Sequence, residues 1–419
     1  MMPTRPPTTL WAVPLVMLLG CAEESENVDA TSSGSDAAAG ADAALPDAAS
    51  PDAGGADASV ANDADTEDTG TSTATWPRPA CNQIQGTAGV TYTIDEGHTL
   101  APTAEVLSGT RYTYGVAALG TPGVLLAVHD GTLLRSIDSG CTWTSVGALP
   151  GGFPVSLIAA GADRAYAWSD NNRELYRIDG TTITPLTSPV NDIHGLAVDL
   201  RDPDRLRLAG GDGQIYESTS AGVGRFAALG NPAFPGSGLV YRVAFDPRNL
   251  DRALAGAAGD GARWTEDGGL TWTPVTGLTA TSSRSRANVF AVAYSPASSD
   301  VVWFQGIDLA EDLGGAPSGG RHIWRSTDGG RTANAVLAQT ATITLINGTL
   351  LVPHPEDADV LYFVFGTYFQ GYGTDLFRYD ARARRLTVEH NDYDEINAIE
   401  FAPGDPAVMF LGLTSEEIR

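Results

Sequence analysis

The chain has 419 residues, with 51 acidic against 25 basic side chains and a formal net charge of −26. Every basic residue is an arginine, so chemistry that depends on lysine is excluded: a P-loop lysine, a Schiff base or a Ser–Lys dyad. Binding to nucleic-acid phosphates needs a basic surface, so the charge also argues against a nucleic-acid partner.

The first 20 residues are predicted to be an export signal. Arg5 precedes an apolar run, residues 10–19, that is too short to span a bilayer, because a transmembrane helix needs about 20 residues. The sequence LLGC at 18–21 resembles the bacterial lipobox, which implies that Cys21 is lipidated. The expected protein is an extracytoplasmic, membrane-anchored lipoprotein, at the outer membrane or cell surface because Ala22 resembles an outer-membrane sorting residue. An ordinary secretory signal with a chance cysteine is the alternative.

Residues 21–75 are predicted to form a disordered linker rich in Ala, Asp and Gly. The stretch contains no aromatic residue, and residues 22–75 hold 13 acidic side chains and no basic one. Such a composition cannot bury enough apolar surface to offset the entropy of ordering. The folded domain is therefore expected to span residues 76–419.

Three cysteines remain to be placed. If Cys21 carries lipid, Cys81 and Cys141 form an even pair in an exported, oxidising setting, and we predict a disulfide between them. Two unpaired buried thiols are the alternative.

Residues 76–419 are predicted to be all-β, with a repeat. Short apolar runs such as VLLAVHD and VLYFVFG are separated by Gly, Pro, Asp and Asn every eight to twelve residues. A turn sequence of the SIDSGCTW type (136–143) occurs six times, and its central residues are separated by 41, 41, 47, 61 and 52 positions. Repeats of about 40–45 residues with four strands each are typical of propeller blades. The six central residues are Asp138, Asp179, Ser220, Asp267, Asp328 and Asp380.

The motif S/T-x-D-x-G-x-T-W resembles the Asp-box, or BNR repeat, of sialidases, sortilin-type receptors, family 74 xyloglucanases and photosystem assembly factors. Asp138, Asp267 and Asp328 match it well, and the other three turns are degenerate. The resemblance implies a β-propeller in which this turn joins the third and fourth strands, away from the ligand-binding face. Asp138, Asp267 and Asp328 are therefore expected to be structural, with Trp143 and Trp272 filling the space between blades.

The blade count follows from the two ends of the domain. The last repeat, INAIEFAPGDPAVMFLGLT (396–414), is half a blade, and GVTYTID (89–95) is an unassigned strand at the other end. Joining them would close a ring without free edges. We predict a seven-bladed propeller with four-stranded antiparallel blades, and six blades is the alternative.

Candidate site residues belong to two enlarged loops and to the mouth of the central channel, where binding residues are commonly carried. Aromatic and charged side chains there suit a sugar or peptide, and paired carboxylates could serve glycoside cleavage; solvated, variable loops and a wet channel lining are the alternative. The first loop (306–322) offers Asp308, Glu311, Asp312, Arg321 and His322. The second (366–375) offers Tyr368, Phe369, Tyr372 and Asp375. The channel mouth offers Tyr114, Asp192, His194, Tyr241, Arg242, Asp394 and Glu395.

The expected function is non-catalytic binding of a protein or glycan at the cell envelope by a monomer that needs no metal or cofactor. The arginine-motif sequence of sialidases is missing, since no RIP tripeptide occurs, and GxSxG and HExxH are also missing. The acid-rich DLRDPDRL (199–206) is predicted to be a capped turn, not a calcium site. A glycoside hydrolase resembling xyloglucanases or divergent sialidases is one alternative, and an assembly or maturation factor is another.

Overall fold

The computed structural model describes residues 76–149, 155–169, 172–235, 239–278, 287–366 and 373–416. All of them belong to one compact unit, Thr71–Arg419. The predicted export signal, Cys21 and the predicted linker lie outside the described residues.

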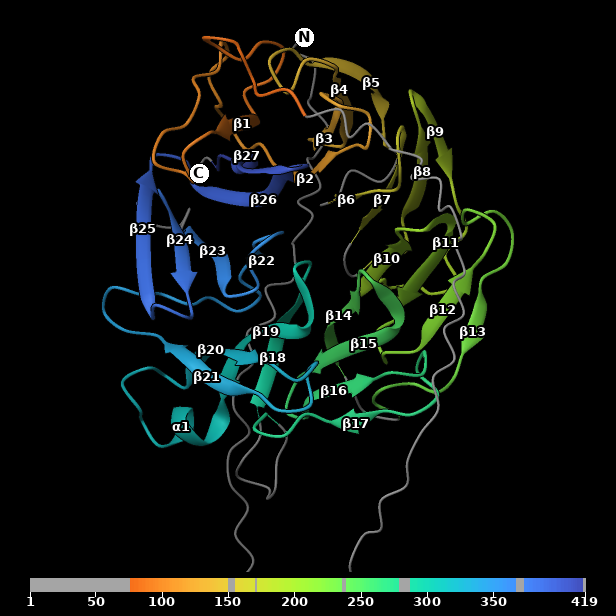
Figure 1. Cartoon of the computed structure of the whole chain (residues 1–419), viewed down its shortest axis with the longest axis vertical. Helices are drawn as coiled ribbons and strands as arrows, with labels where there is room; N and C mark the ends of the chain where they lie inside the picture. The colour runs from red at the N-terminus through yellow and green to blue at the C-terminus, as the bar shows by residue number, and fades with distance from the viewer. Residues whose placement is uncertain are drawn as a thin grey trace, which may run out of the picture. The chain divides into compact units, whose positions relative to one another are not determined.

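The described strands form seven antiparallel sheets arranged as a ring (Figure 1). Six sheets have four strands in chain order, and the seventh has three. We call the six four-stranded sheets blades 1 to 6, in chain order, and the three-stranded sheet the closing blade. The predicted seven-bladed β-propeller is confirmed, and the six-bladed alternative is wrong.

The first three blades take up residues 113–229. Blade 1 contains β2 (Thr113–Ala118), β3 (Leu125–His129), β4 (Thr132–Ser136) and β5 (Thr144–Ala148). Blade 2 contains β6 (Val155–Ala159), β7 (Arg164–Ser169), β8 (Leu175–Asp179) and β9 (Thr182–Pro185). Blade 3 contains β10 (Gly195–Asp199), β11 (Asp202–Ala209), β12 (Ile215–Ser218) and β13 (Ala227–Leu229).

The other blades follow the same plan. Blade 4 contains β14 (Val240–Asp246), β15 (Asn249–Ala257), β16 (Gly261–Thr265) and β17 (Thr273–Pro274). Blade 5 contains β18 (Ala287–Ser295), β19 (Ser298–Asp308), β20 (Arg321–Ser326) and β21 (Asn334–Ala338), with helix α1 (Leu309–Leu313) between β19 and β20. Blade 6 contains β22 (Leu351–Pro353), β23 (Val360–Gly366), β24 (Thr374–Asp380) and β25 (Arg385–Asn391). The closing blade contains β26 (Glu395–Ala402), β27 (Asp405–Thr414) and β1 (Val90–Thr93).

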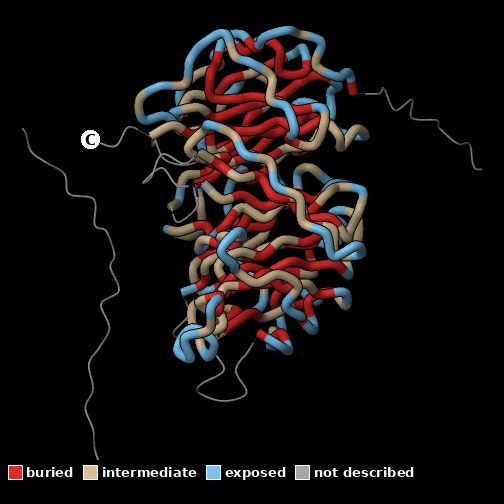
Figure 2. The backbone as a smooth tube through the Cα atoms, turned by 90° about the vertical axis from the view of Figure 1, so that its left-hand side faces the viewer, coloured by how far each residue is buried: buried red, intermediate tan, exposed pale blue. Residues whose placement is uncertain are grey.

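Position within a blade explains the apolar pattern of each strand. The first strands line the centre of the ring, where β2 contacts both β6 and β26, and β14 contacts both β10 and β18. Second strands such as β19 lie between two neighbouring strands and pack against adjacent blades on both faces. Consecutive residues of these strands are therefore buried, without the alternation of buried and exposed positions that a half-exposed strand shows. Fourth strands such as β5 are short and largely exposed. Figure 2 shows the result, with buried backbone in bands through the blades and exposed backbone at the connecting turns.

The closing blade joins the two ends of the domain. β1 pairs antiparallel with β27, with Val90 opposite Gly412 and Thr93 opposite Met409. Beyond β1 the chain returns alongside it, because the Ala101 N–H donates to the Tyr92 carbonyl at 2.9 Å. The prediction that GVTYTID completes the last blade is therefore confirmed, and the ring has no break between its first and last strands.

A disulfide fastens the segment before β1 to blade 1. Cys81 and Cys141 are bonded, as predicted, across a sequence separation of 60 residues. Next to the bond, Gln85 exchanges backbone hydrogen bonds of 2.9 Å with Cys141 and Trp143. On the other side, Arg78 binds Asp405 of β27 at 2.5 Å. The N-terminal segment of the domain thus bridges blade 1 and the closing blade.

The two faces of the ring carry different connections. Successive strands of a blade are antiparallel, so the turns between third and fourth strands lie on the same face as the corners between first and second strands. We call this face the turn face. The other face, called the mouth face, carries the starts of the first strands and the loops between second and third strands, including α1.

The turn face is organised by four aspartates with the same hydrogen bonds. In blade 1, Asp138 accepts from the Ser136 hydroxyl at 2.8 Å and from Thr142 through both its N–H at 2.9 Å and its hydroxyl at 2.7 Å. Burial acts to raise the pKa of Asp138, but these hydrogen bonds outweigh it and hold the pKa below its usual value. Asp267 and Asp328 have the same geometry.

The fourth such aspartate, Asp95, follows β1 and was not predicted. It accepts from Thr93 at 2.7 Å and from the Thr99 N–H and hydroxyl at 2.9 and 2.6 Å. The sequence TIDEGHT (93–99) has the same spacing as the other turns but lacks the tryptophan. The degenerate turns differ, since Asp179 pairs with Arg164 and Arg177 instead.

The two predicted tryptophans lie between blades. Trp143 is buried in a cluster with residues of blade 1 and the closing blade. Trp272 is half-buried and packs against the core shared by blades 3 and 4, and its indole N–H donates to the Asn231 carbonyl at 2.9 Å. The stretch 199–206 begins with the predicted capped turn, in which Asp199 accepts from the Arg201 N–H at 2.9 Å, and continues as the start of β11.

Candidate functional site

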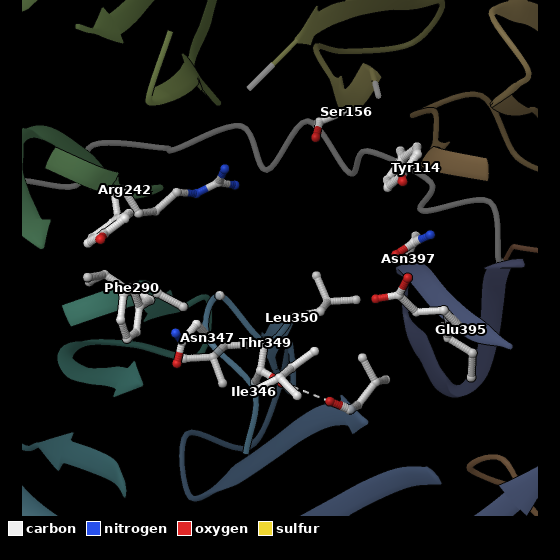
Figure 3. Close-up of a pocket in the computed structure, with 17 residues that line it drawn as sticks. Tyr114, Ser156, Arg242, Phe290, Ile346, Asn347, Thr349, Leu350, Glu395 and Asn397 are labelled. Carbon is white, nitrogen blue, oxygen red and sulfur yellow. Dashed lines mark hydrogen bonds between the residues drawn. The ribbon is translucent and has the colours of Figure 1, made fainter. Parts of the chain in front are cut away.

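A cavity of about 610 Å³ opens at the centre of the mouth face (Figure 3). Its lining comes mainly from the first strands, and the residues just before them, in blades 1, 2, 4, 5 and 6 and the closing blade. These segments converge because the strands are arranged around one axis. We call it the mouth cavity. Its polar and aromatic lining residues are Tyr114, Ser156, Tyr241, Arg242, Phe290, Asn347, Thr349, Glu395 and Asn397.

Two opposite charges face each other across the mouth cavity. Figure 3 shows the Arg242 side chain extending into it from β14, and the Glu395 carboxylate extending from β26 on the other side. The Arg242 guanidinium lies over the Trp168 ring, 5.1 Å from its centroid. Among the described lining residues, Glu395 is the only carboxylate and Arg242 the only cation.

Glu395 occupies an unfavourable position for a charge. With its amide nitrogen directed at Glu395, Asn397 donates a hydrogen bond of 3.1 Å and accepts one from the Thr414 hydroxyl. Burial, and secondarily the charge of Glu416, raises the pKa of Glu395 to about 7. None of the described arginines or histidines forms an ion pair with it.

Aromatic rings flank both charges. Tyr241 and Phe290 lie beside Arg242 in the lining, with ring centroids 4.7 Å apart. On the Glu395 side, Tyr114 stacks on Tyr112 at 5.6 Å. The lining therefore combines apolar ring faces with one negative and one positive wall, an arrangement that suits an amphipathic ligand.

The predicted mouth residues separate into two groups. Tyr114, Tyr241, Arg242 and Glu395 line the cavity together, whereas Asp192, His194 and Asp394 are not among its lining residues. His194 is buried, and its ring nitrogens lie 3.3 Å from the Tyr241 carbonyl and from the Asp192 carboxylate. Asp394 accepts from the Glu416 N–H at 2.6 Å.

The first enlarged loop is held in place by its own charged residues. Asp308 is half-buried and is the N-cap of α1, accepting from the Ala310 N–H at 2.8 Å. Glu311 pairs with the buried His322 at 2.7 Å. Asp312 is exposed.

The base of this loop reaches the mouth cavity. The Arg321 guanidinium donates to the side-chain oxygen of Asn347, which lines the cavity. In the second enlarged loop, Tyr368, Phe369 and Tyr372 lie outside the described residues. Asp375, at the edge of that loop, pairs with His390 at 2.7 Å.

Sequence reasoning missed several cavity residues. Phe290, Asn347, Thr349 and Asn397 line the mouth cavity but were not candidates. Phe290 and Asn397 lie inside predicted first strands, so an alignment of strand starts between blades could have found them. Asn347 and Thr349 precede β22 in a stretch without charge or motif, and the sequence contains no signal for them.

No described group of three or more His, Cys, Asp or Glu side chains could hold a metal ion. In the same residues, no helix is both long and apolar enough to span a membrane.

The ring of seven sheets and the cavity at its axis define the chain as a seven-bladed β-propeller with a central mouth site. Over 348 residues, the chain is 49% identical to the Dispase autolysis-inducing protein of Streptomyces mobaraensis, which covers 83% of this chain and 92% of the relative. The chain belongs to the family of that protein. No protein-family profile matches it.

Solved structures share the fold at low sequence identity. The family 74 xyloglucanase of Xanthomonas campestris superposes with a TM-score of 0.54 and 17% identity, covering 77% of this chain and 52% of the enzyme. The chain thus spans about half the length of the xyloglucanase. YCF48 bound to a D1 peptide superposes with a TM-score of 0.50 and 13% identity, covering 81% of this chain and all of YCF48. These likenesses concern the fold alone.

Proposed function

We propose that this chain is a non-catalytic protein-binding propeller whose ligand is a protease. The observation that carries the proposal is the 49% identity across 92% of a relative whose name states that it induces autolysis of dispase. Autolysis is self-cleavage, so the named effect falls on a protease and requires no catalytic residue of the propeller itself.

The mouth cavity supports binding over hydrolysis. Glycoside cleavage normally needs two carboxylates on either side of the scissile bond, one as acid and one as base or nucleophile. Among the described lining residues only Glu395 carries a carboxylate. Its neighbours are aromatic and amide side chains, which are suited to contacting a polypeptide.

We assign the protein to the cell envelope, outside the cytoplasm and anchored through lipid on Cys21. The disulfide between Cys81 and Cys141 is consistent with an oxidising compartment. We also assign the four turns at Asp95, Asp138, Asp267 and Asp328 to the Asp-box type, because each carboxylate satisfies the backbone of its own turn. Their place on the turn face leaves the mouth face for the ligand.

Incubation of the purified chain with dispase tests the proposal. We expect a complex in gel filtration and a faster loss of intact dispase, followed by mass spectrometry, than in dispase alone. Dispase blocked at its active site is the control: it should bind the chain but should not be cleaved. Absence of a complex together with unchanged self-cleavage would contradict the proposal, and release of sugars from xyloglucan would favour a hydrolase instead.

A further inference from the structure

We propose that the mouth cavity receives a protruding loop of the protein ligand and that this loop presents a lysine or arginine side chain to Glu395. The inference rests on the proposed function, because it names the part of the protease that the propeller contacts. It assigns a binding role to the centre of the mouth face and none to the turn face.

The shape of the cavity fits a loop. About 610 Å³ is enough for several side chains, and it lies within the usual range of ligand pockets. Its walls come from six of the seven blades, so a ligand must enter along the axis of the ring and not across its rim. A protruding segment can do this, whereas a flat protein surface cannot.

The charge of Glu395 indicates what the loop carries. Glu395 is half-buried, a partly desolvated carboxylate gains from an opposite charge, and no described arginine or histidine pairs with it. Carboxylates near the turn face are paired by contrast, as Asp251 is with Arg207 at 2.6 Å. A cationic side chain from the ligand would supply the missing partner, and the adjacent Glu416 would add to the attraction.

The other walls give the bound loop a direction. Tyr114 can cover the apolar stem of a lysine or arginine beside Glu395, and its ring can contact the cation itself. Across the cavity, Arg242 is held over the Trp168 ring and faces inward, where it can donate to carbonyl or carboxylate oxygens of the loop. The cation therefore binds at the closing blade and the acceptor at blade 4.

This arrangement makes binding depend on pH. The groups that face Glu395 are Glu416 from the C-terminal segment, Asn397 and Thr414 from the closing blade, and Tyr114 from blade 1. Because burial raises the pKa of Glu395 to about 7, the residue is largely protonated at pH 6 and largely ionised at pH 8. A cationic ligand binds the ionised form, so affinity should increase across this interval.

The test compares two variants of Glu395 with a control on the turn face. Binding of active-site-blocked dispase is measured by titration calorimetry with the full chain, E395Q, E395R and E356R; Glu356 is exposed in the corner between β22 and β23. We expect E395Q to weaken binding about 10-fold at pH 8, E395R at least 100-fold, and E356R less than twofold. E395Q preserves the shape of the side chain and should also abolish the increase between pH 6 and pH 8.

The outcomes separate the two proposals. If wild-type protein binds dispase and E395R binds it equally well, the loop-insertion inference is wrong and the proposed function stands. If the melting temperature shows that E395R does not fold, E395Q provides the test instead. An E395Q variant with wild-type affinity and the wild-type pH dependence would also overturn the inference. If wild-type protein does not bind dispase, the proposed function fails first, and the inference fails with it.

Discussion

Arg207 on β11 of blade 3 contacts Asp251 on β15 of blade 4 through a hydrogen bond of 2.6 Å. The guanidinium is buried, and it also contacts Glu217 at 2.8 Å and the Leu250 carbonyl. Asp251 in turn accepts the Gly268 N–H through its backbone carbonyl at 2.9 Å. Asp251 thus connects Arg207 of blade 3 to the Asp267 turn of blade 4.

A similar arginine–aspartate ion pair occurs at five consecutive blade junctions, and the longest of them, Arg252–Asp300, spans 3.9 Å. In each, an arginine of one blade reaches an aspartate at the start of the second strand of the next blade. The pairs are Arg135–Asp163, Arg164–Asp204, Arg207–Asp251, Arg252–Asp300 and Arg325–Asp359. The guanidinium of arginine holds its N–H donors in a fixed planar fork, so it can orient two acceptors at once, whereas lysine, which the chain lacks, carries its donors on a flexible stem.

Replacing Arg207 with alanine should destabilise the domain by roughly 1–3 kcal/mol, because a buried acceptor loses its donor while the half-exposed Asp251 can turn to water. The loss leaves the Leu250 carbonyl without its donor, whereas Glu217 keeps the hydrogen bond from Arg205 at 2.9 Å. Urea unfolding followed by tryptophan fluorescence measures it. Arg225→Ala is the control, because Arg225 is exposed, and it should change stability by about 0.5 kcal/mol or less. Equal midpoints for both variants would show that the interblade pair does not contribute.

Sequence patterns predicted the elements of this ring but not the contacts between them. The turn before β11 was predicted, yet the partner of Asp251 lies 44 residues away on another blade. Side-chain pairing across blades depends on the twist and spacing of the sheets, which no local pattern contains. The turn at Asp95 could have been predicted, because TIDEGHT has the same spacing as the other turns.

The lining of the mouth cavity could also be predicted from the sequence only in part. Tyr114, Tyr241, Arg242 and Glu395 were placed correctly, because the start of a first strand can be located from the repeat. Asp308 does not line the cavity and is the N-cap of α1, a role that could not be predicted because five helical residues are too few to show a periodicity. Charged residues in enlarged loops are therefore poorer guides to this site than strand starts.

Asp95→Ala should cost roughly 1–3 kcal/mol of stability and should match Asp267→Ala, because both remove the same set of hydrogen bonds from a turn. In both residues burial opposes the hydrogen bonds, but the pKa is held below its usual value. Their contribution is therefore full above about pH 5 and is lost as the pH falls below about 4. The difference between wild type and either variant should shrink in acid, as measured by urea unfolding at pH 7 and pH 3. Dispase binding should not change.

Removal of the disulfide should weaken the ring where its ends meet. C81S/C141S releases a 60-residue loop, which corresponds to about 4 kcal/mol on the chain-entropy model. Thermal unfolding of the double variant should begin at a lower temperature, and addition of a reducing agent should shift wild type in the same direction. C21A is the control, because Cys21 has no part in the bond. A reducing agent that leaves the wild-type transition unchanged would contradict the expectation.

Glu400 provides a pH-dependent contact between the closing blade and blade 1. Its carboxylate, on β26, accepts the Ala118 N–H of β2 at 3.1 Å. Burial raises the pKa of Glu400 to about 7, and the hydrogen bond from Ala118 opposes this only in part. The unfolded chain ionises near pH 4.3, so the native state holds the proton more tightly between about pH 4.5 and pH 7. Stability therefore falls as the pH rises through this interval and is level above it.

Glu400→Gln should remove this dependence while keeping an oxygen that accepts from Ala118. We expect the variant to be more stable than wild type at pH 8 and to match wild type near pH 5. The difference at pH 8 should be on the order of 1–2 kcal/mol, because the small exposed surface of Glu400 reduces the cost of its charge. Urea unfolding at the two pH values gives the comparison, and E356Q, on the exposed turn face, should follow wild type at both. A variant less stable than wild type at pH 8 would mean that the ionised carboxylate strengthens the junction between the closing blade and blade 1, contrary to the effect of its burial.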